Sequence, residues 1–499
     1  MRDGTPGAAF GAAAVFLGAG VAGGAWPTGW AALVCALACG AVGTTLLAVR
    51  RRGRDSEAPE EVRDAVSDLA EHDAAVKPVR PGRSSLVAAA VVWALALLAG
   101  GIWTLTAGDD TEAGDGTEAG APAKPSASSD AKPSVGWLVP AAGQRGDKGV
   151  GSWGLGPTVA HGRIDGLFAY DSADGSLRWS VPAPPREALC AMSPKTGEGV
   201  GLVAHGRYEK PCATLLAVRA SDGKVLWKRQ LGGEGLDGGA LAVGGATAVT
   251  AEDGAVRGRS TETGEQRWQR RLGKDCTVLA LDADATRTRL VEQCGKGARL
   301  VALDTRTGDR RWTRDLPVES AARASVVSVS PVVVDVDEAD ARGTHAFLGF
   351  DDEGAPTATV PLTGPEGALS ALWSVADGRT VRPLVLDGLL ITFAEKDSIS
   401  PSTVVAYSLK DGRKVWAHHS EEQLMALAAE PDGSVAYLGF DASVTLLDRS
   451  TGKVRRVLEP DAGKRPTVSI HPELVPVPGG HVVLNQILLQ GEPAAFALR

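Results

Sequence analysis

The chain of 499 residues lacks most features that identify a function directly. Its net charge is −8 and its only basic run is one short loop, so it offers no surface for a phosphate backbone, and we expect no nucleic-acid partner. It has no P-loop, nucleophile elbow or zinc-binding spacing, and asparagine occurs once, at Asn485. Hydrophobic residues make up 44% of the chain, which excludes general disorder, while 62 glycines and 29 prolines indicate a turn-rich β protein.

Long apolar stretches are present near the N-terminus and predict three transmembrane helices. Residues 6–49 divide at a Pro-Thr-Gly turn between Trp26 and Trp30, and each arm has about the twenty residues that cross a hydrocarbon core of about 30 Å. Residues 86–107 are uncharged throughout. The loop between them, 50–85, is rich in arginine, so the positive-inside rule predicts that it is cytoplasmic and that the chain after it ends outside the cytoplasm. A cleaved signal peptide is the alternative, but the apolar run is too long for one.

Residues 108–134 contain no large apolar side chain and repeat a short acidic motif. Such a segment cannot bury a core, so we predict a disordered linker with a root-mean-square span of about 30 Å. The linker would hold the remaining domain, residues 135–499, near the membrane.

A repeated pattern, with a glycine four residues before a tryptophan, runs through residues 135–499. Two copies keep only the glycine, at Gly354 and Gly452, and carry Ala358 and Arg456 in the tryptophan position. The glycines recur about every 45 residues, which is typical of propeller blades built from four antiparallel strands. The five complete copies are Gly175 with Trp179, Gly223 with Trp227, Gly264 with Trp268, Gly308 with Trp312, and Gly412 with Trp416.

The residues around each copy fit a blade. An apolar run such as 300–303 precedes the turn, as expected for a strand covered on both faces, and the glycine supplies the positive φ that the reversal needs. The tryptophan then falls on the outer strand, where its ring would fill the gap between adjacent sheets. Ordinary hairpins with core tryptophans would not explain five copies at one spacing.

The outer strands also predict the number of blades. The glycine pattern accounts for seven, and an eighth outer strand is available at Trp137, whose flanking residues resemble those of Trp179. If the Trp137 strand pairs with three strands between Pro466 and Leu498, the two ends of the domain share one blade and close the ring. We therefore predict an all-β, eight-bladed propeller, with seven blades as the alternative.

Residues 302–312, with the pattern Ala-x-Asp-x-x-Thr-Gly-x-x-x-Trp, resemble the tryptophan-docking motif of pyrroloquinoline-quinone (PQQ)-like β-propeller repeats. The resemblance covers roughly residues 135–499. It implies the propeller fold, but such repeats occur in quinone-dependent dehydrogenases, in outer-membrane assembly scaffolds and in sensor ectodomains, so it does not select a function.

A quinone-dependent dehydrogenase of this type would carry calcium on carboxylate and asparagine ligands, an aspartate base, a tryptophan floor and often a vicinal cysteine pair. The chain has no such cysteine pair, and Asn485 lies in an apolar run. Acidic groups at 335–340 and 351–353 are explained by turns and solvated strands. We therefore expect no cofactor, no catalytic residues and no metal site, with PQQ and calcium as the alternative.

Four cysteines lie in the propeller segment at matched places in two blades. This placement predicts two disulfides, one within each blade, in an oxidising compartment. Free buried thiols are the alternative. The predicted disulfide residues are Cys190, Cys212, Cys276 and Cys294.

The other candidate side chains point to structure. His418 and His419 are adjacent on a strand, so they would face opposite sides and could not bind one metal. Trp153 and Trp373 fall outside the docking positions and are interpreted as packing residues. We interpret the chain as a membrane-anchored, extracytoplasmic propeller that binds a protein, peptide or cell-envelope ligand. A PQQ-dependent dehydrogenase and a sensor ectodomain are the alternatives.

Overall fold

The computed structural model describes residues 135–140, 148–208, 210–371, 382–396, 401–461, 465–469, 471–487 and 492–499. The regular elements in these ranges are strands, and no helix there is long and apolar enough to cross a membrane. The predicted helices at 6–49 and 86–107, the loop at 50–85 and the linker at 108–134 lie outside the described residues. These four assignments stay predictions.

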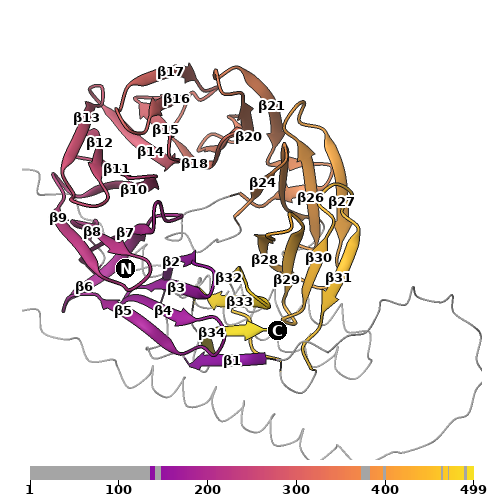
Figure 1. Cartoon of the computed structure of the whole chain (residues 1–499). Coiled ribbons are helices and arrows are strands. Elements are labelled where there is room, and N and C mark those ends of the chain that lie inside the picture. The colour runs from indigo at the N-terminus through magenta and orange to yellow at the C-terminus, as the bar shows by residue number, and fades with distance from the viewer. Residues whose placement is uncertain are drawn as a thin grey trace, which may run out of the picture. The chain divides into compact units, whose positions relative to one another are not determined.

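The strands form eight sheets arranged in a ring, which we number as blades 1 to 8, with the first strand of a blade toward the centre and the last at the rim (Figure 1). Blade 1 contains β2 (Gly149–Gly154), β3 (Thr158–Arg163), β4 (Gly166–Asp171) and β5 (Leu177–Pro182). Blade 2 contains β6 (Glu187–Met192), β7 (Val200–Arg207), β8 (Thr214–Arg219) and β9 (Val225–Gln230). Blade 3 contains β10 (Leu236–Gly244), β11 (Thr247–Glu252), β12 (Ala255–Ser260) and β13 (Gln266–Arg271). Blade 4 contains β14 (Cys276–Ala283), β15 (Arg287–Cys294), β16 (Gly297–Asp304) and β17 (Arg310–Asp315).

The second half of the ring is built in the same way. Blade 5 contains β18 (Ala322–Val329), β19 (Val332–Glu338), β20 (His345–Phe350) and β21 (Pro356–Pro361). Blade 6 contains β22 (Thr363–Gly364), β23 (Gly367–Leu369), β24 (Leu384–Leu386), β25 (Leu389–Glu395), β26 (Thr403–Ser408) and β27 (Lys414–His419). Blade 7 contains β28 (Leu424–Ala429), β29 (Val435–Gly439), β30 (Val444–Leu447) and β31 (Val454–Leu458). Blade 8 contains β32 (Pro472–Val477), β33 (Gly480–Asn485), β34 (Pro493–Leu498) and β1 (Val135–Pro140).

Blade 8 joins the two ends of the domain. Strand β1 is its outer strand and pairs antiparallel with β34, so that Val135 lies opposite Leu498 and Leu138 lies opposite Phe496. The predicted closure and the predicted eight blades are therefore confirmed. Closing the ring in this way leaves each sheet packed between two neighbours.

The hydrophobic core lies between successive sheets. Strands such as β3 and β11 are buried along their whole length because neighbouring blades cover both of their faces. One cluster combines Val249 and Trp268 of blade 3 with Leu290 and Leu303 of blade 4. The apolar runs in the sequence thus form strands that pack on two sides.

The six tryptophans of the repeat pack against the glycine turn of the next blade in the ring. Five of the six indole Nε1 atoms donate a hydrogen bond of 2.7 to 3.0 Å to a carbonyl oxygen of that turn. No side chain beyond hydrogen fits at these glycines, since a Cβ atom built on Gly264 would lie 2.7 Å from the ring of Trp227. The contacts are Trp137 on Gly175, Trp179 on Gly223, Trp227 on Gly264, Trp268 on Gly308, Trp312 on Gly354, and Trp416 on Gly452.

Both predicted disulfides are formed, each within one blade. Cys190 on β6 bonds to Cys212, which precedes β8 in blade 2, with 5.9 Å between the Cα atoms. Cys276 and Cys294 lie opposite each other on β14 and β15 of blade 4, with 4.1 Å between the Cα atoms. The bonds link segments 22 and 18 residues apart.

Candidate functional site

Within the part of the chain that the structure describes, two of the eight blade interfaces lack a tryptophan, and they differ in how the space is used. Between blades 5 and 6, Ala358 takes the tryptophan position, and the turn of blade 6 lies directly against the backbone of blade 5. A Cβ atom on Gly412 would lie 2.5 Å from the carbonyl oxygen of Thr359. This interface is closed by backbone contact.

The interface between blades 7 and 8 cannot close in that way. Arg456 on β31 takes the tryptophan position, and it lies opposite Leu446 on β30. In the other blades a turn joins the third and fourth strands and carries the docking glycine, but in blade 8 these strands are β34 and β1, from opposite ends of the domain. Blade 8 therefore has no such turn to receive a side chain from blade 7.

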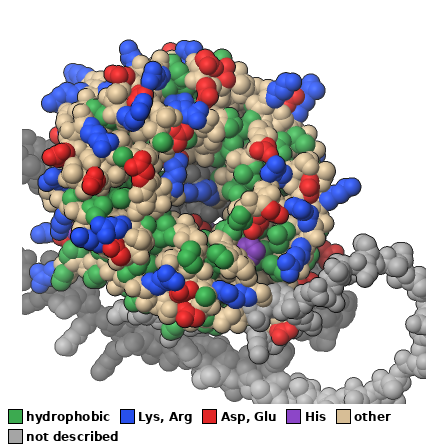
Figure 2. All heavy atoms as spheres, viewed as in Figure 1, with side chains coloured by type: hydrophobic (Ala, Val, Ile, Leu, Met, Phe, Trp, Pro, Cys, Tyr) green, Lys and Arg blue, Asp and Glu red, His purple; other side chains and the backbone are tan. Residues whose placement is uncertain are grey.

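A pocket of about 1040 Å³ opens at this interface, and we call it the closure pocket. It involves the turns between the first and second strands of blades 7, 8, 1 and 2, all at the same face of the ring because turns in an antiparallel sheet alternate between its two ends. Figure 2 shows one face of the ring hollowed at its centre, with acidic and basic side chains interspersed around it. The lining includes Leu446, Arg456 and Leu458 of blade 7, Val475 and Val477 of blade 8, and Pro194 of blade 2.

A buried polar pair joins blades 7 and 8 at the pocket wall. His481 Nε2 lies 2.7 Å from Glu430 Oε1, and the two side chains are 4% and 12% exposed. A carboxylate only accepts hydrogen bonds, so Nε2 carries a proton, and Nδ1 is an acceptor only where the ring is neutral. Within the described part of the chain, Nδ1 of His481 has no hydrogen-bond partner.

The charged side chains of the pocket are unequally satisfied. Glu473 accepts a hydrogen bond of 3.0 Å from Gln486 Nε2, and Lys195 lies 3.2 Å from Asp282 Oδ2. Arg456 is exposed and forms no ion pair with any residue that the structure describes. Among the described residues, the pocket thus combines apolar walls, a histidine nitrogen without a hydrogen-bond partner and an arginine without an ion pair.

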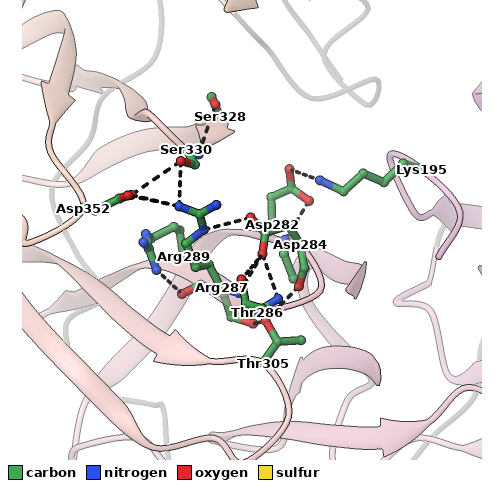
Figure 3. A network of polar contacts seen from close by, with 12 residues as sticks. Lys195, Asp282, Asp284, Thr286, Arg287, Arg289, Thr305, Ser328, Ser330 and Asp352 are labelled. Atoms are coloured by element: carbon green, nitrogen blue, oxygen red, sulfur yellow. Dashed lines mark hydrogen bonds and ion pairs between the residues drawn. The ribbon is translucent and has the colours of Figure 1, made fainter. Parts of the chain in front are cut away.

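The same face of the ring carries a polar network that sequence reasoning did not identify (Figure 3). Arg287, at the start of β15, binds Asp284 at 3.0 Å and reaches blade 5, where it binds Ser330 at 2.7 Å and Asp352 at 3.0 Å. Lys195 extends from blade 2 to Asp282 of blade 4. These contacts link segments that are far apart in sequence: Arg287 joins the neighbouring blades 4 and 5, and Lys195 joins blades 2 and 4.

Asp351 and Glu338, from the acidic groups noted in the sequence, serve local structure, whereas Asp352 binds Arg287 of blade 4. Asp351 accepts backbone hydrogen bonds from Glu353 and Ala355 of its own turn. Burial works against ionisation of Glu338, but hydrogen bonds from the backbone nitrogens of Thr344 and Glu319 hold its pKa at about 2. These side chains stabilise turns, as the sequence interpretation proposed.

The other candidates are dispersed. His418 contacts Tyr437 and His419 contacts Thr403, so the adjacent histidines point apart. Trp153 is 2% exposed and donates its Nε1 hydrogen to the carbonyl of Ser193, which is a packing role. Trp373 lies outside the described residues.

The residues at the hub do not fit a calcium and quinone pair. Asn485 accepts from the backbone nitrogen of Ser469 and donates to the carbonyls of Thr467 and Pro493, so its oxygen is already engaged. A smaller cavity of about 130 Å³ lies among the innermost strands, and Glu473 is the one carboxylate among its described lining residues. No described cluster of three or more His, Cys, Asp or Glu side chains could hold a metal ion.

The fold and the docking geometry define a β-propeller whose blades are locked by PQQ-like tryptophan repeats. The family model described as outer membrane protein assembly factor BamB matches residues 165–418 and 365–492, and the chain belongs to this family. The predicted resemblance is thereby confirmed.

Solved structures with similar folds come from diverse proteins. BamB from Moraxella catarrhalis is 16% identical, with a TM-score of 0.40, and the match covers 70% of this chain and 93% of that chain. Sqt1 from Saccharomyces cerevisiae is 11% identical, with a TM-score of 0.47 and coverage of 74% and 99%. A europium-containing methanol dehydrogenase is 12% identical, with a TM-score of 0.44 and coverage of 70% and 84%. No curated protein matches the sequence.

Proposed function

We propose that this protein is a membrane-anchored scaffold whose propeller, outside the cytoplasm, binds a protein or peptide ligand in the closure pocket. The observation that carries the proposal is the pocket itself, of about 1040 Å³, framed by strand ends and turns of four blades. Binding sites in proteins are typically concave and mainly apolar, with a few polar groups that orient the ligand. The closure pocket has this composition.

Three further observations support the parts of the proposal that concern the location and the role of the protein. Disulfides persist in oxidising compartments, so the pairs in blades 2 and 4 favour a propeller outside the cytoplasm. The apolar stretches at 6–49 and 86–107, with the arginine-rich loop between them, favour a membrane anchor. The family description names an assembly factor, which favours binding over turnover.

Site-specific photo-crosslinking in cells tests this proposal, with two probe positions at opposite ends of blade 7. Pro431, in the turn between β28 and β29, lines the closure pocket, whereas Phe440, in the turn between β29 and β30, is 55% exposed at the other end of the sheet. A photo-crosslinking amino acid at 431 should capture a defined partner that mass spectrometry identifies. The same amino acid at 440 should not capture that partner.

Two outcomes would contradict the proposal. If no partner is captured from 431, the pocket does not bind a macromolecule in the cell. If 431 and 440 capture the same partners equally, contact is non-specific. Both variants alter exposed turn residues, so neither change should disturb the packing between blades.

A further inference from the structure

We infer that the closure pocket binds an acidic peptide segment through a tryptophan side chain. The indole of the partner would take the place of the docking tryptophan that blade 7 lacks. This inference rests on the proposed binding role of the pocket. It specifies the ligand by the side chain that enters the interface and by the charge beside it.

The ring itself shows which side chain fits between its blades. Six interfaces each hold an indole, and in five of them the residue opposite that indole on the neighbouring strand is Ala or Gly, as for Ala302 opposite Trp312. Blade 7 departs from this pattern, because Leu446 lies opposite Arg456. Leu446 is half-buried, and with Leu458 it presents an apolar wall to the pocket where an indole would otherwise lie.

The contrast with the other interface that lacks a tryptophan shows why space remains. At the interface that contains Ala358, the turn of blade 6 lies against the backbone of blade 5 and leaves no gap. Blade 8 has no turn between its third and fourth strands, so nothing from the described part of the chain takes the place of the indole. Among the described residues, the space is therefore open to a side chain from another molecule.

The polar groups of the pocket select the chemistry of that side chain and its neighbour. In the ring, an indole Nε1 donates to an acceptor of the next blade. In blade 8, Nδ1 of the 4% exposed His481 side chain has no hydrogen-bond partner among the described residues, and it accepts a hydrogen bond where the ring is neutral. An indole N–H would satisfy it, which relieves the cost of a buried unpaired acceptor. Arg456 forms no ion pair with a described residue, and it would bind a carboxylate next to the tryptophan.

Other ligand classes fit the lining less well. Trp153 is the single Trp, Tyr or Phe among the described lining residues, and at 2% exposure it offers no open ring on which a sugar could stack. The lining also mixes acidic and basic groups, which does not suit a purely anionic headgroup. A peptide can present both an aromatic ring and a carboxylate at adjacent positions.

A peptide-binding measurement on the full chain tests the inference. The probe is a fluorescently labelled hexapeptide with a central tryptophan flanked by aspartates, and its binding is followed by fluorescence anisotropy. Replacing the tryptophan of the probe by alanine should weaken binding at least about tenfold, and replacing the aspartates by asparagines should weaken it by a similar factor. Phenylalanine in place of tryptophan should weaken binding less than alanine does, because it retains the ring but cannot donate to His481.

Variants of the protein give the matched controls. Arg456→Glu should weaken binding of the aspartate-containing peptide at least about tenfold, because attraction becomes repulsion. Arg455→Glu makes the same charge change one residue earlier, at the β-bulge of β31, where Arg455 pairs with exposed Asp432 and does not line the pocket. This control should bind the peptide like the wild-type protein.

A double variant fills the pocket from within. Arg456→Trp combined with Leu446→Ala recreates the pair of residues found in blades 1, 2, 4 and 6, and it should abolish peptide binding while circular dichroism shows an intact β-sheet spectrum. The inference is wrong if the wild-type protein binds the alanine peptide as tightly as the tryptophan peptide. It is also wrong if Arg456→Glu and Arg455→Glu bind equally.

The two proposals fail in distinguishable ways. If the probe at 431 captures a partner but the tryptophan peptide does not bind, the pocket is a binding site for another chemistry, and only the ligand assignment is overturned. If neither the cellular probe nor the peptide gives a signal, the binding role of the pocket is overturned as well.

Discussion

Adding one methyl group to a docking glycine provides the sharpest test of how the blades are held together. Gly264 lies in the turn between β12 and β13 with a φ of 71°, and a Cβ atom there would lie 2.7 Å from Trp227 Cδ2. Gly264→Ala should therefore combine two costs. An alanine in the left-handed region costs about 1 to 2 kcal/mol, and overpacking against the ring costs about 1 to 3 kcal/mol more.

Gly254 is the matched control because it separates these two costs. It lies in the turn between β11 and β12 of the same blade with a φ of 60°, and no heavy atom lies within 4 Å of the position of its Cβ. Gly254→Ala should lower the free energy of unfolding by the conformational cost alone, about 1 to 2 kcal/mol. The difference between the two variants measures the clash with Trp227.

A double-mutant cycle completes the test. Trp227→Ala alone should cost about 3 to 5 kcal/mol, because the 8% exposed ring and its hydrogen bond to Thr261 are lost. In that background Gly264→Ala should cost no more than Gly254→Ala, which gives a coupling energy of about 1 to 3 kcal/mol. Equilibrium urea unfolding followed by far-ultraviolet circular dichroism measures each value without relying on tryptophan fluorescence. Two results would refute the idea that Trp227 holds the blades together by packing on Gly264. One is an equal loss in the free energy of unfolding for Gly264→Ala and Gly254→Ala, and the other is a loss for Gly264→Ala that does not change when the Trp227 ring is removed.

Three further predictions concern the disulfides, the buried histidine and the membrane topology. In the unfolded, unreduced protein a thiol reagent should modify none of the four propeller cysteines, and Cys190→Ser should lower the free energy of unfolding by about 3 kcal/mol; four reactive propeller thiols would contradict both pairings. Burial and the nearby charge of Arg163 lower the pKa of His161 from 6.5 to about 4. Between these values the unfolded chain takes up a proton that the folded protein does not, so the free energy of unfolding should fall by up to about 3 kcal/mol as the pH drops from about 6.5 to about 4. His161→Phe should lack that part of the pH dependence, and an unchanged profile in denaturant titrations would contradict it. Protease added outside spheroplasts should cleave an epitope tag after residue 499 but spare one inserted in the loop 50–85; the reverse pattern would overturn the predicted topology.

Much of the fold follows from patterns that are local along the chain. The spacing of glycine and tryptophan, the apolar run before each turn and the matched cysteine positions each depend on a few neighbouring residues. Strand alternation and turn chemistry translate such patterns directly into hairpins, blades and disulfides within a blade. The likeness between the segments around Trp137 and Trp179 extended this reasoning to the closing strand. The membrane helices and the linker stay predictions from the same kind of local pattern.

The closure pocket depends on relations that no local pattern contains. In the sequence, Arg456 is only the residue that replaces tryptophan in an incomplete copy of the repeat, and His481 is an isolated histidine. Their meaning depends on the pairing of β1 with β34, which removes the turn that would receive a side chain from blade 7. Glu430 and His481 are 51 residues apart and meet only because blades 7 and 8 pack face to face. The sequence by itself determined the blades and the wedges between them, because these arise from short-range periodicity. Only the tertiary structure decided that the missing tryptophan of blade 7 leaves a pocket and which groups surround that pocket, because ring closure brings together segments from both ends of the domain.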